Sequence, residues 1–332
     1  MSNPSHLRSN WLGSAGWGLM FHYIDKPASS NVPSSTTAAE WNRRIDGFNV
    51  ANFTRRVRES GASYVIFTLG QNTGHFCSPN RVYDGIVGSP TSLLSRRDLI
   101  TEIATALAPD IRMIAYLPSH APANYTEAIR AFKLMPSWDA GAWGLKKDWT
   151  DSECADERLT VFQRGWESVV AHWGERWGCL VSGWWIDGCY FSKRMYDAVD
   201  GPNFASFAQA LRAGNADRIL AFNSGTARPF ERLSLEQDYT AGEFSDRLPV
   251  PTKWAALESK TDGMQTHLLG YLGSWWGEGS PRLSDALASS YTREVVSRGA
   301  AITWDVPLGL NGDISEPFLR QFEHLQSHVA AS

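Results

Sequence analysis

The chain has 332 residues, which is long enough for one large barrel or for two ordinary domains. Its 43% hydrophobic and 20% charged residues are typical of a globular protein, and a net charge of -4 argues against a nucleic-acid partner. No segment approaches the length of a membrane span and the amino terminus lacks an apolar stretch of signal-peptide length, so we expect no membrane partner and a cytoplasmic location.

Apolar runs alternate with helical patterns along the whole chain. The runs that predict strands are Gly16–Ile24, Tyr64–Leu69, Ile111–Leu117, Leu180–Asp187, Ile219–Asn223, Gln237–Ala241, Leu268–Ser274 and Ala300–Asp305. The patterns that predict helices are Asn49–Ser60, Ser95–Leu107, Ala155–Trp173, Phe204–Ala213, Ser284–Ser297 and Glu316–Ser327. Eight strands alternating with helices predict an α/β fold, a single (β/α)8-like barrel of the TIM type over residues 1–332. The long polar segment Asp25–Asn42 after the first strand suits an active-site loop.

Polar or aromatic residues follow most of the predicted strands. They are His22-Tyr23, Gln71-Asn72, His120, Asp187, Asn223, Glu243 and Trp304-Asp305. The carboxyl ends of barrel strands converge on one face, so these side chains are expected to share a pocket. Such a set suits a polyhydroxylated ligand that is bound by hydrogen bonds.

The stretch GWWIDGCY, residues 183–190, places an aspartate directly after an apolar run. The run reads as a buried parallel strand, and Gly188 suits a sharp exit from it. Asp187 would then lie at the carboxyl end of a core strand, where α/β folds place their chemistry. An aspartate at this point also suits a cap for the next loop or helix, so both interpretations stay open here.

Metal and phosphate motifs are missing from the sequence. There is no His-x-His, His-Glu-x-x-His, phosphate-binding loop or Gly-x-Ser-x-Gly elbow, and the four cysteines form no Cys-x-x-Cys pair. We therefore expect no metal and no cofactor. The remaining candidate for a catalytic site is a pair of carboxylates, which are the catalytic groups of most glycoside hydrolases. The 15 tryptophans suit mainly a core, but their rings can also stack on sugars.

Five segments resemble, in chain order, glycoside hydrolase family 29, the α-L-fucosidases. GWGLMFHYID resembles the opening strand of that family, and YVIFTLGQNTGHF resembles its second-strand segment. The strand ending in WWIDG resembles the segment with the aspartate nucleophile, and DYTAGEF resembles the segment with the general acid of some members. ITWDVPLGLNGDISEPFLRQFEHL resembles the closing strand, turn and helix.

The resemblance implies a retaining exo-glycosidase with a carbohydrate substrate. Asp187 would be the ionised nucleophile, surrounded by hydrogen-bond donors, and Glu243 the general acid/base with a raised pKa, about 5 Å away. Glu258 is the second choice for the acid/base and Glu236 the third. The residues expected to bind the sugar are His22, Gln71, Asn72, His120 and Asn223, with Trp185 or Trp304 as a stacking platform, although Trp185 suits core packing equally well.

Departures from the family pattern leave the sugar open. Gln71-Asn72 stands where the family has a His-His pair, and Tyr23 stands where it has Trp. The chain also has no room for an accessory β-sandwich after the barrel. Two alternatives remain: a glycosidase with a different sugar specificity, and a sugar-binding barrel without turnover. The oligomeric state is not predicted.

Overall fold

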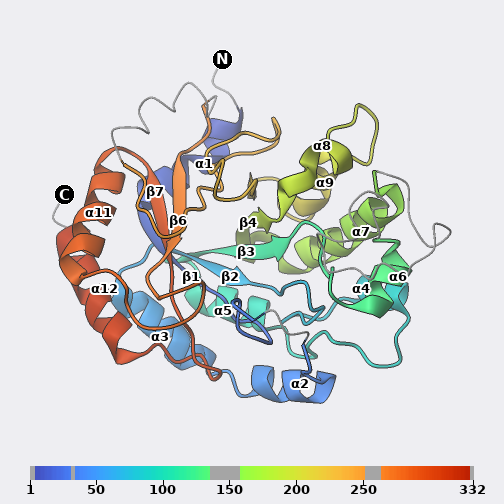
Figure 1. Cartoon of the computed structure of the whole chain (residues 1–332), viewed down its shortest axis with the longest axis horizontal. Coiled ribbons are helices and arrows are strands. Elements are labelled where there is room, and N and C mark those ends of the chain that lie inside the picture. Colours follow the sequence, from blue (N-terminus) through green and yellow to red (C-terminus); the bar gives the residue numbers. More distant parts are fainter. Residues whose placement is uncertain (1–3, 31–33, 135–157, 251–262, 330–332) are drawn as a thin grey trace.

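A computed structural model describes residues 4–30, 34–134, 158–250 and 263–329. Within these residues, seven parallel strands form one curled sheet in the order β5-β4-β3-β2-β1-β7-β6 (Figure 1). The strands are β1 Trp17–Phe21, β2 Tyr64–Thr68, β3 Arg112–Pro118, β4 Val181–Asp187, β5 Ile219–Phe222, β6 His267–Tyr271 and β7 Ala301–Asp305. The fold is therefore α/β and consistent with a TIM-like barrel.

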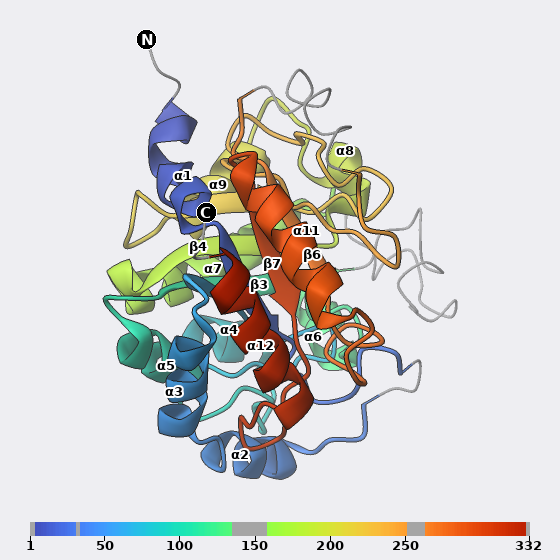
Figure 2. The ribbon, with the colours of Figure 1, turned by 90° about the vertical axis from the view of Figure 1, so that its left-hand side faces the viewer.

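Helices surround the sheet, most of them on its outer face. They are α1 Pro4–Ala15, α2 Ala38–Asp46, α3 Val50–Ser60, α4 Arg81–Val87, α5 Leu99–Leu107, α6 Thr126–Phe132, α7 Thr160–Trp177, α8 Ser192–Met195, α9 Phe204–Leu211, α11 Asp285–Ser297 and α12 Glu316–Val329. Short 3-10 turns, η2 Gly178–Leu180 and η3 Cys189–Phe191, flank β4. Helices α3, α12 and α11 lie side by side on one flank (Figure 2). None of the helices in the described parts is long and apolar enough to cross a membrane.

One of the eight expected strands, Gln237–Ala241, is not a regular strand. The segment lies between β5 and β6, where Asp238 N donates to Leu220 O at 2.9 Å and Leu269 N donates to Gly242 O at 2.9 Å. It forms only isolated bridges, Tyr239 with Gln265 and Glu243 with Leu269. Gly242 interrupts a regular ladder because it has a φ of +69° and donates its N–H to Pro229 O instead. An irregular segment, residues 237–244, therefore occupies the place expected for a strand.

Helices α1, α2, α4, α6 and α8 lie outside the helices that the sequence pattern predicted. The segment Asp25–Asn42, expected to be a loop, includes the start of a helix, because α2 begins at Ala38. Thr37 and Glu40 form a capping box, in which each side chain accepts from the other's backbone N–H. Helix α1 was not expected at all, since its sequence PSHLRSNWLGSA lacks a clear apolar stripe.

The alternation of side chains separates two apolar cores. Residues facing the barrel interior form one cluster, which includes Met20, Tyr64, Ile114, Tyr116 and Trp185. Residues on the opposite face of the strands pack against the helices in a larger cluster, which includes Leu19, Val65, Ala115, Trp184 and Trp304. Each strand is buried on both faces, which explains why the strands read as nearly continuous apolar runs.

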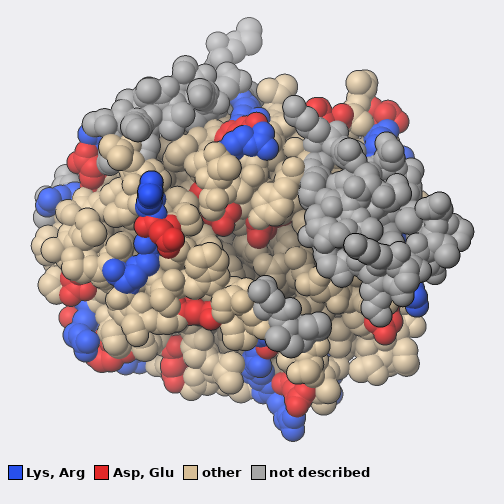
Figure 3. Space-filling model, viewed as in Figure 1, with Lys and Arg blue, Asp and Glu red and all other residues tan. Residues whose placement is uncertain are grey.

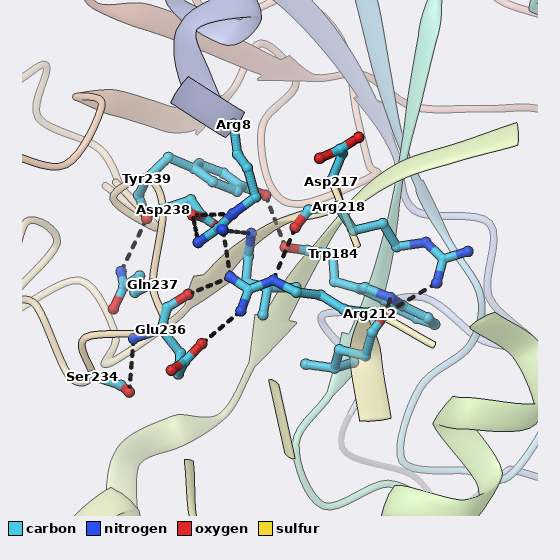
Figure 4. A network of polar contacts seen from close by, with 12 residues as sticks. Arg8, Trp184, Arg212, Asp217, Arg218, Ser234, Glu236, Gln237, Asp238 and Tyr239 are labelled. Carbon is cyan, nitrogen blue, oxygen red and sulfur yellow. Dashed lines mark hydrogen bonds and ion pairs between the residues drawn. The ribbon is translucent and has the colours of Figure 1, made fainter. Parts of the chain in front are cut away.

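Helix α1 covers the amino ends of the strands. Its Leu12 belongs to the interior cluster, and Arg8 forms an ion pair with buried Asp238 at 2.9 Å. Asp238 also accepts from Arg212 at 2.9 Å, and Arg212 pairs with Glu236 at 2.6 Å (Figure 4). This network ties α1 and the start of the irregular segment to the loop after α9. The two ends of the barrel thus differ, because the opposite end is left to the loops that follow the strands.

Candidate active site

One side-chain amide joins two carboxylates at the carboxyl ends of the strands. Asn223 Nδ2 donates to Asp187 Oδ1 at 2.9 Å and to Glu243 Oε2 at 2.6 Å. Both contacts share the Asn223 Nδ2 atom. The sum of their lengths therefore sets an upper limit of about 5.5 Å on the distance between Asp187 Oδ1 and Glu243 Oε2. Asp187 ends β4 and Glu243 ends the irregular segment beside β6. The two residues chosen from the sequence as a catalytic pair therefore lie together.

The position of Asp187 follows from the pairing of β4. This strand is bonded in parallel to β3 on one side and to β5 on the other, with Pro118 opposite Asp187. Gly188 then turns the chain at a φ of +71°, and its N–H donates to Asp187 Oδ1 at 2.7 Å. A Cβ at position 188 would lie 2.5 Å from the His120 ring, so only glycine fits there.

A chain of hydrogen bonds reaches Asp187 from the neighbouring strands. The Tyr116 hydroxyl on β3 donates to Asp187 Oδ2 at 2.5 Å and accepts from Gln71 Nε2 at 2.7 Å. The Tyr116 ring stacks on Trp185 with 5.4 Å between ring centroids, which fixes its direction. The exposed Tyr190 hydroxyl makes a longer contact of 3.4 Å with Asp187 Oδ1. Four donors thus surround the Asp187 carboxylate.

Glu243 lies in a different environment. Burial and then the charge of Asp187 raise the pKa of Glu243 to about 7, although donation by Asn223 and the charge of His22 oppose the rise. The Glu243 side chain is therefore close to half-protonated at neutral pH. A carboxyl group in that state can donate a proton and take one back.

His22 follows β1 and is a further polar residue beside the two carboxylates. Its Nδ1 lies 2.7 Å from Asp305 Oδ1, and Gly277 N donates to Asp305 Oδ2 at 2.5 Å. Burial alone would lower the pKa of His22, but Asp305, Asp187 and Glu243 together raise it above the ordinary value. A positively charged imidazole is thus favoured beside the two carboxylates.

The other residues predicted to bind the sugar have varied surroundings. Gln71 reaches the pair through Tyr116, and Asn72 Oδ1 is buried without a hydrogen-bond partner among the described residues. His120 is buried beneath Gly188, and burial holds its pKa well below the ordinary value. This position makes His120 a support for the end of β4.

Both tryptophans chosen as stacking platforms are core residues, which corrects that expectation. Trp304 is fully buried on the helix side of β7, where its Nε1 donates to Thr292 Oγ1 of α11 at 2.8 Å. Trp185 is buried in the barrel interior and donates to Ala241 O at 3.0 Å. Neither ring has a free face for a ligand.

Of the two other residues considered for the general acid/base, only Glu236 lies within the described residues. Glu236 precedes the segment that ends at Glu243, and its carboxylate is held in an ion pair with Arg212, within the network that Arg8 of α1 joins (Figure 4). Glu258 lies outside the described residues.

Tyr116 and Trp276 lie at the site but were not among the residues predicted from the sequence. Tyr116 lies within an apolar run, and its inward direction follows from strand alternation. Trp276, on the loop after β6, packs against His22 at 5.8 Å and Tyr271 at 5.0 Å between centroids. Trp276 is only partly buried, so it is the better candidate for an aromatic contact at the mouth of the site.

A hollow lies near the middle of the face shown in Figure 3, and most of the residues around it are uncharged. Acidic side chains also lie beside it, and acidic and basic residues are interspersed elsewhere on the view. Within the described residues no group of three or more His, Cys, Asp or Glu side chains is arranged to hold a metal ion.

Fold and geometry together define a TIM-like α/β protein with a paired-carboxylate site. No family model matches the chain, and a search of curated proteins finds no match. Solved structures do match: the endo-fucoidan hydrolase MfFcnA9 from glycoside hydrolase family 107 has a TM-score of 0.74 at 18% identity, over 99% of this chain and 65% of that one. The family 107 endo-fucoidan hydrolase MfFcnA4 has a TM-score of 0.71 at 18% identity, over 99% of this chain and 55% of that one.

The likeness extends to fucosidases. Alpha-L-fucosidase isoenzyme 1 from Paenibacillus thiaminolyticus has a TM-score of 0.66 at 14% identity, over 99% of this chain and 76% of that one. This chain thus spans between about half and two thirds of the family 107 structures named above. At these identities the likeness shows the fold alone, which this chain shares with the named endo-fucoidan hydrolases and α-L-fucosidase. Membership of family 29 in particular is not confirmed, because family 107 structures match as well.

Proposed function

We propose that the protein is a retaining glycoside hydrolase that acts on α-L-fucosides. The observation that carries the proposal is the short distance, at most about 5.5 Å, between an oxygen of Asp187 and one of Glu243. Retaining glycosidases keep their carboxyl groups about 5–5.5 Å apart, whereas inverting enzymes leave roughly 6.5–9.5 Å for a water molecule. The unequal surroundings of the two groups assign their roles.

In the first step Asp187 acts as the nucleophile. One of its oxygens attacks the anomeric carbon while the bond from that carbon to the leaving oxygen breaks. Glu243, protonated because its pKa is raised to about 7, gives its proton to the leaving oxygen. The products are a glycosyl ester on Asp187 and a free alcohol, with Glu243 now ionised.

In the second step Glu243 acts as the base. It takes a proton from a water molecule, whose oxygen attacks the anomeric carbon and breaks the ester bond to Asp187. The Asp187 carboxylate is regenerated and Glu243 is again protonated. The two inversions together retain the anomeric configuration of the substrate.

The proposal of fucose as the sugar rests on the structural neighbours and on the polar residues His22 and Gln71 beside the carboxylates. Endo-fucoidan hydrolases and α-L-fucosidases share the fold, which supports a fucose-containing substrate. His22 and Gln71 supply hydrogen-bonding groups beside the carboxylates for sugar hydroxyls. We propose exo-action, as the resemblance to family 29 implies.

A panel of 4-nitrophenyl glycosides that includes α-L-fucopyranoside tests this proposal, with Asp187→Asn as the control. Release of 4-nitrophenol from the fucoside by the wild type only, with the α-anomer of fucose appearing first in proton NMR, is the expected result. First appearance of the β-anomer would overturn retention. Cleavage of another glycoside alone would overturn the sugar assignment, and fucoidan cut into oligosaccharides without free fucose would overturn exo-action. Binding of fucose without any turnover would leave a sugar-binding barrel.

A further inference from the structure

We propose that Asn223 is a positioning residue, a single amide that spans Asp187 and Glu243, fixes their separation and favours the ionised form of Glu243. Asn223 was expected from the sequence to contact a sugar hydroxyl, and its bonds instead connect the two carboxylates. The consequence for catalysis rests on the proposed function. The contacts themselves do not.

The orientation of the amide is determined by its partners. Asn223 Oδ1 accepts from Gly225 N at 3.0 Å, in a turn that Gly225 permits with a φ of +87°. The NH2 group therefore faces the carboxylates, and each of its two protons has one acceptor, Asp187 at 2.9 Å and Glu243 at 2.6 Å. The reverse orientation would place Oδ1 against two carboxylates. No amide proton remains for a substrate hydroxyl.

Two backbone hydrogen bonds join Asn223 to the residues that flank the Asp187-Gly188 pair. Its N–H donates to Ile186 O at 2.8 Å, and its carbonyl accepts from Cys189 N at 2.9 Å. Ile186 and Cys189 lie just before and just after the Asp187-Gly188 pair. Because Asn223 is also fully buried, its side chain has little freedom to move. The amide is thus a rigid bridge from the end of β4 to Glu243.

The charges around Glu243 explain why such a bridge matters. Asp187 from β4 repels an ionised Glu243, and burial disfavours its charge, whereas His22 from β1 favours it. The hydroxyls of Tyr116 and Tyr190 also face this cluster. Asn223 is the neutral donor that lowers the pKa of Glu243 while contacting its repulsive neighbour. Without the amide, Glu243 would lose this donor and would hold its proton to higher pH.

The test is a titration of Glu243 that does not depend on activity. Protein labelled with 13C at the glutamate carboxyl carbons is titrated by NMR, and Glu243→Gln identifies the resonance. In Asn223→Ala the midpoint for Glu243 should move to higher pH than in the wild type. In Asn223→Ser, which keeps an oxygen for Gly225 N and one donor, the shift should be smaller. Asn49→Ala removes the N-cap of α3 far from the site and should leave the midpoint unchanged.

Kinetics provides the second measurement. With an α-L-fucoside, kcat of Asn223→Ala should fall by about 100-fold, the order that an ångström of misplacement costs, and the alkaline limb of its pH profile should move upward. An unchanged midpoint in both Asn223 variants would overturn the role of Asn223, even if the protein is a fucosidase. If Asn223→Ala does not fold, an unchanged midpoint in Asn223→Ser overturns it alone. A shifted midpoint in a protein that cleaves no glycoside would support the bridge and overturn the proposed function.

Discussion

Replacing Glu243 by Gln should stabilise the protein at alkaline pH and leave its stability nearly unchanged in acid. Below pH 4.5 the carboxyl is protonated in both the folded and the unfolded chain, so Glu and Gln are similar. Between pH 4.5 and about 7 only the unfolded chain ionises, so the free energy of unfolding of the wild type falls as the pH rises. Above pH 7 the folded protein carries the full cost of the buried charge.

The magnitude follows from the same values. A rise of the pKa from 4.5 to about 7 corresponds to about 3 kcal/mol, at about 1.4 kcal/mol per pH unit. Because Glu243 is only partly buried and solvent screens part of the interaction, we expect a gain of about 2 kcal/mol for Glu243→Gln above pH 8.

Urea unfolding at pH 4.5 and at pH 8.5, followed by tryptophan fluorescence, measures both free energies. Glu323→Gln, an exposed change on α12, is the matched control and should make no difference at either pH. An equal gain for Glu243→Gln at both pH values would refute the reasoning, because a contact unrelated to charge would then be responsible.

Three other predictions concern the residues around the pair. Asp187→Ala should lower kcat by several orders of magnitude without unfolding the protein, and azide should restore turnover of an activated aryl glycoside; near-normal turnover without azide would remove the nucleophile assignment. Tyr116→Phe should lower kcat about 10- to 100-fold, since it deletes a donor to a charged group, and an unchanged kcat would show that the contact at 2.5 Å is dispensable. Trp304→Phe should lower the free energy of unfolding by about 1–2 kcal/mol through loss of the bond to Thr292, while KM for a fucoside stays the same; a raised KM at unchanged stability would restore Trp304 as a sugar platform.

Local pattern was enough to predict the position of Asp187 at the end of a core strand. The apolar run before Asp187 and the glycine after it describe a core strand and its exit, and the carboxyl end of β4 lies where that reading placed it. The same alternation could have excluded Trp304. Trp304 and Asp305 are neighbours on one strand and so face opposite sides, and Asp305 faces His22 in the site.

Contacts between distant strands could not be read from local pattern. Tyr116 reaches Asp187 only because β3 pairs with β4 in a particular register, with Pro118 opposite Asp187. The bond from Asn223 to Glu243 depends on the irregular segment beside β6, for which the sequence predicted an ordinary strand. Glycine-dependent interruptions of a ladder, such as the one at Gly242, have no clear periodic signature.

The uneven attachment of the irregular segment suggests how such a site can evolve. β4 lies between two complete ladders, and a shift of one residue there would turn every side chain to the wrong face. The segment 237–244 is joined to β5 by backbone bonds that, among the described residues, all end at Leu220 O. Insertions or deletions in the loop between β5 and this segment would therefore disturb few bonds to β5, whereas four backbone bonds join the segment to residues 265–269. If Asp187 and Glu243 have the proposed roles, we expect that, in descendants of a common ancestor, the residue at position 187 is kept while the residue at position 243 changes its type and its place along the chain.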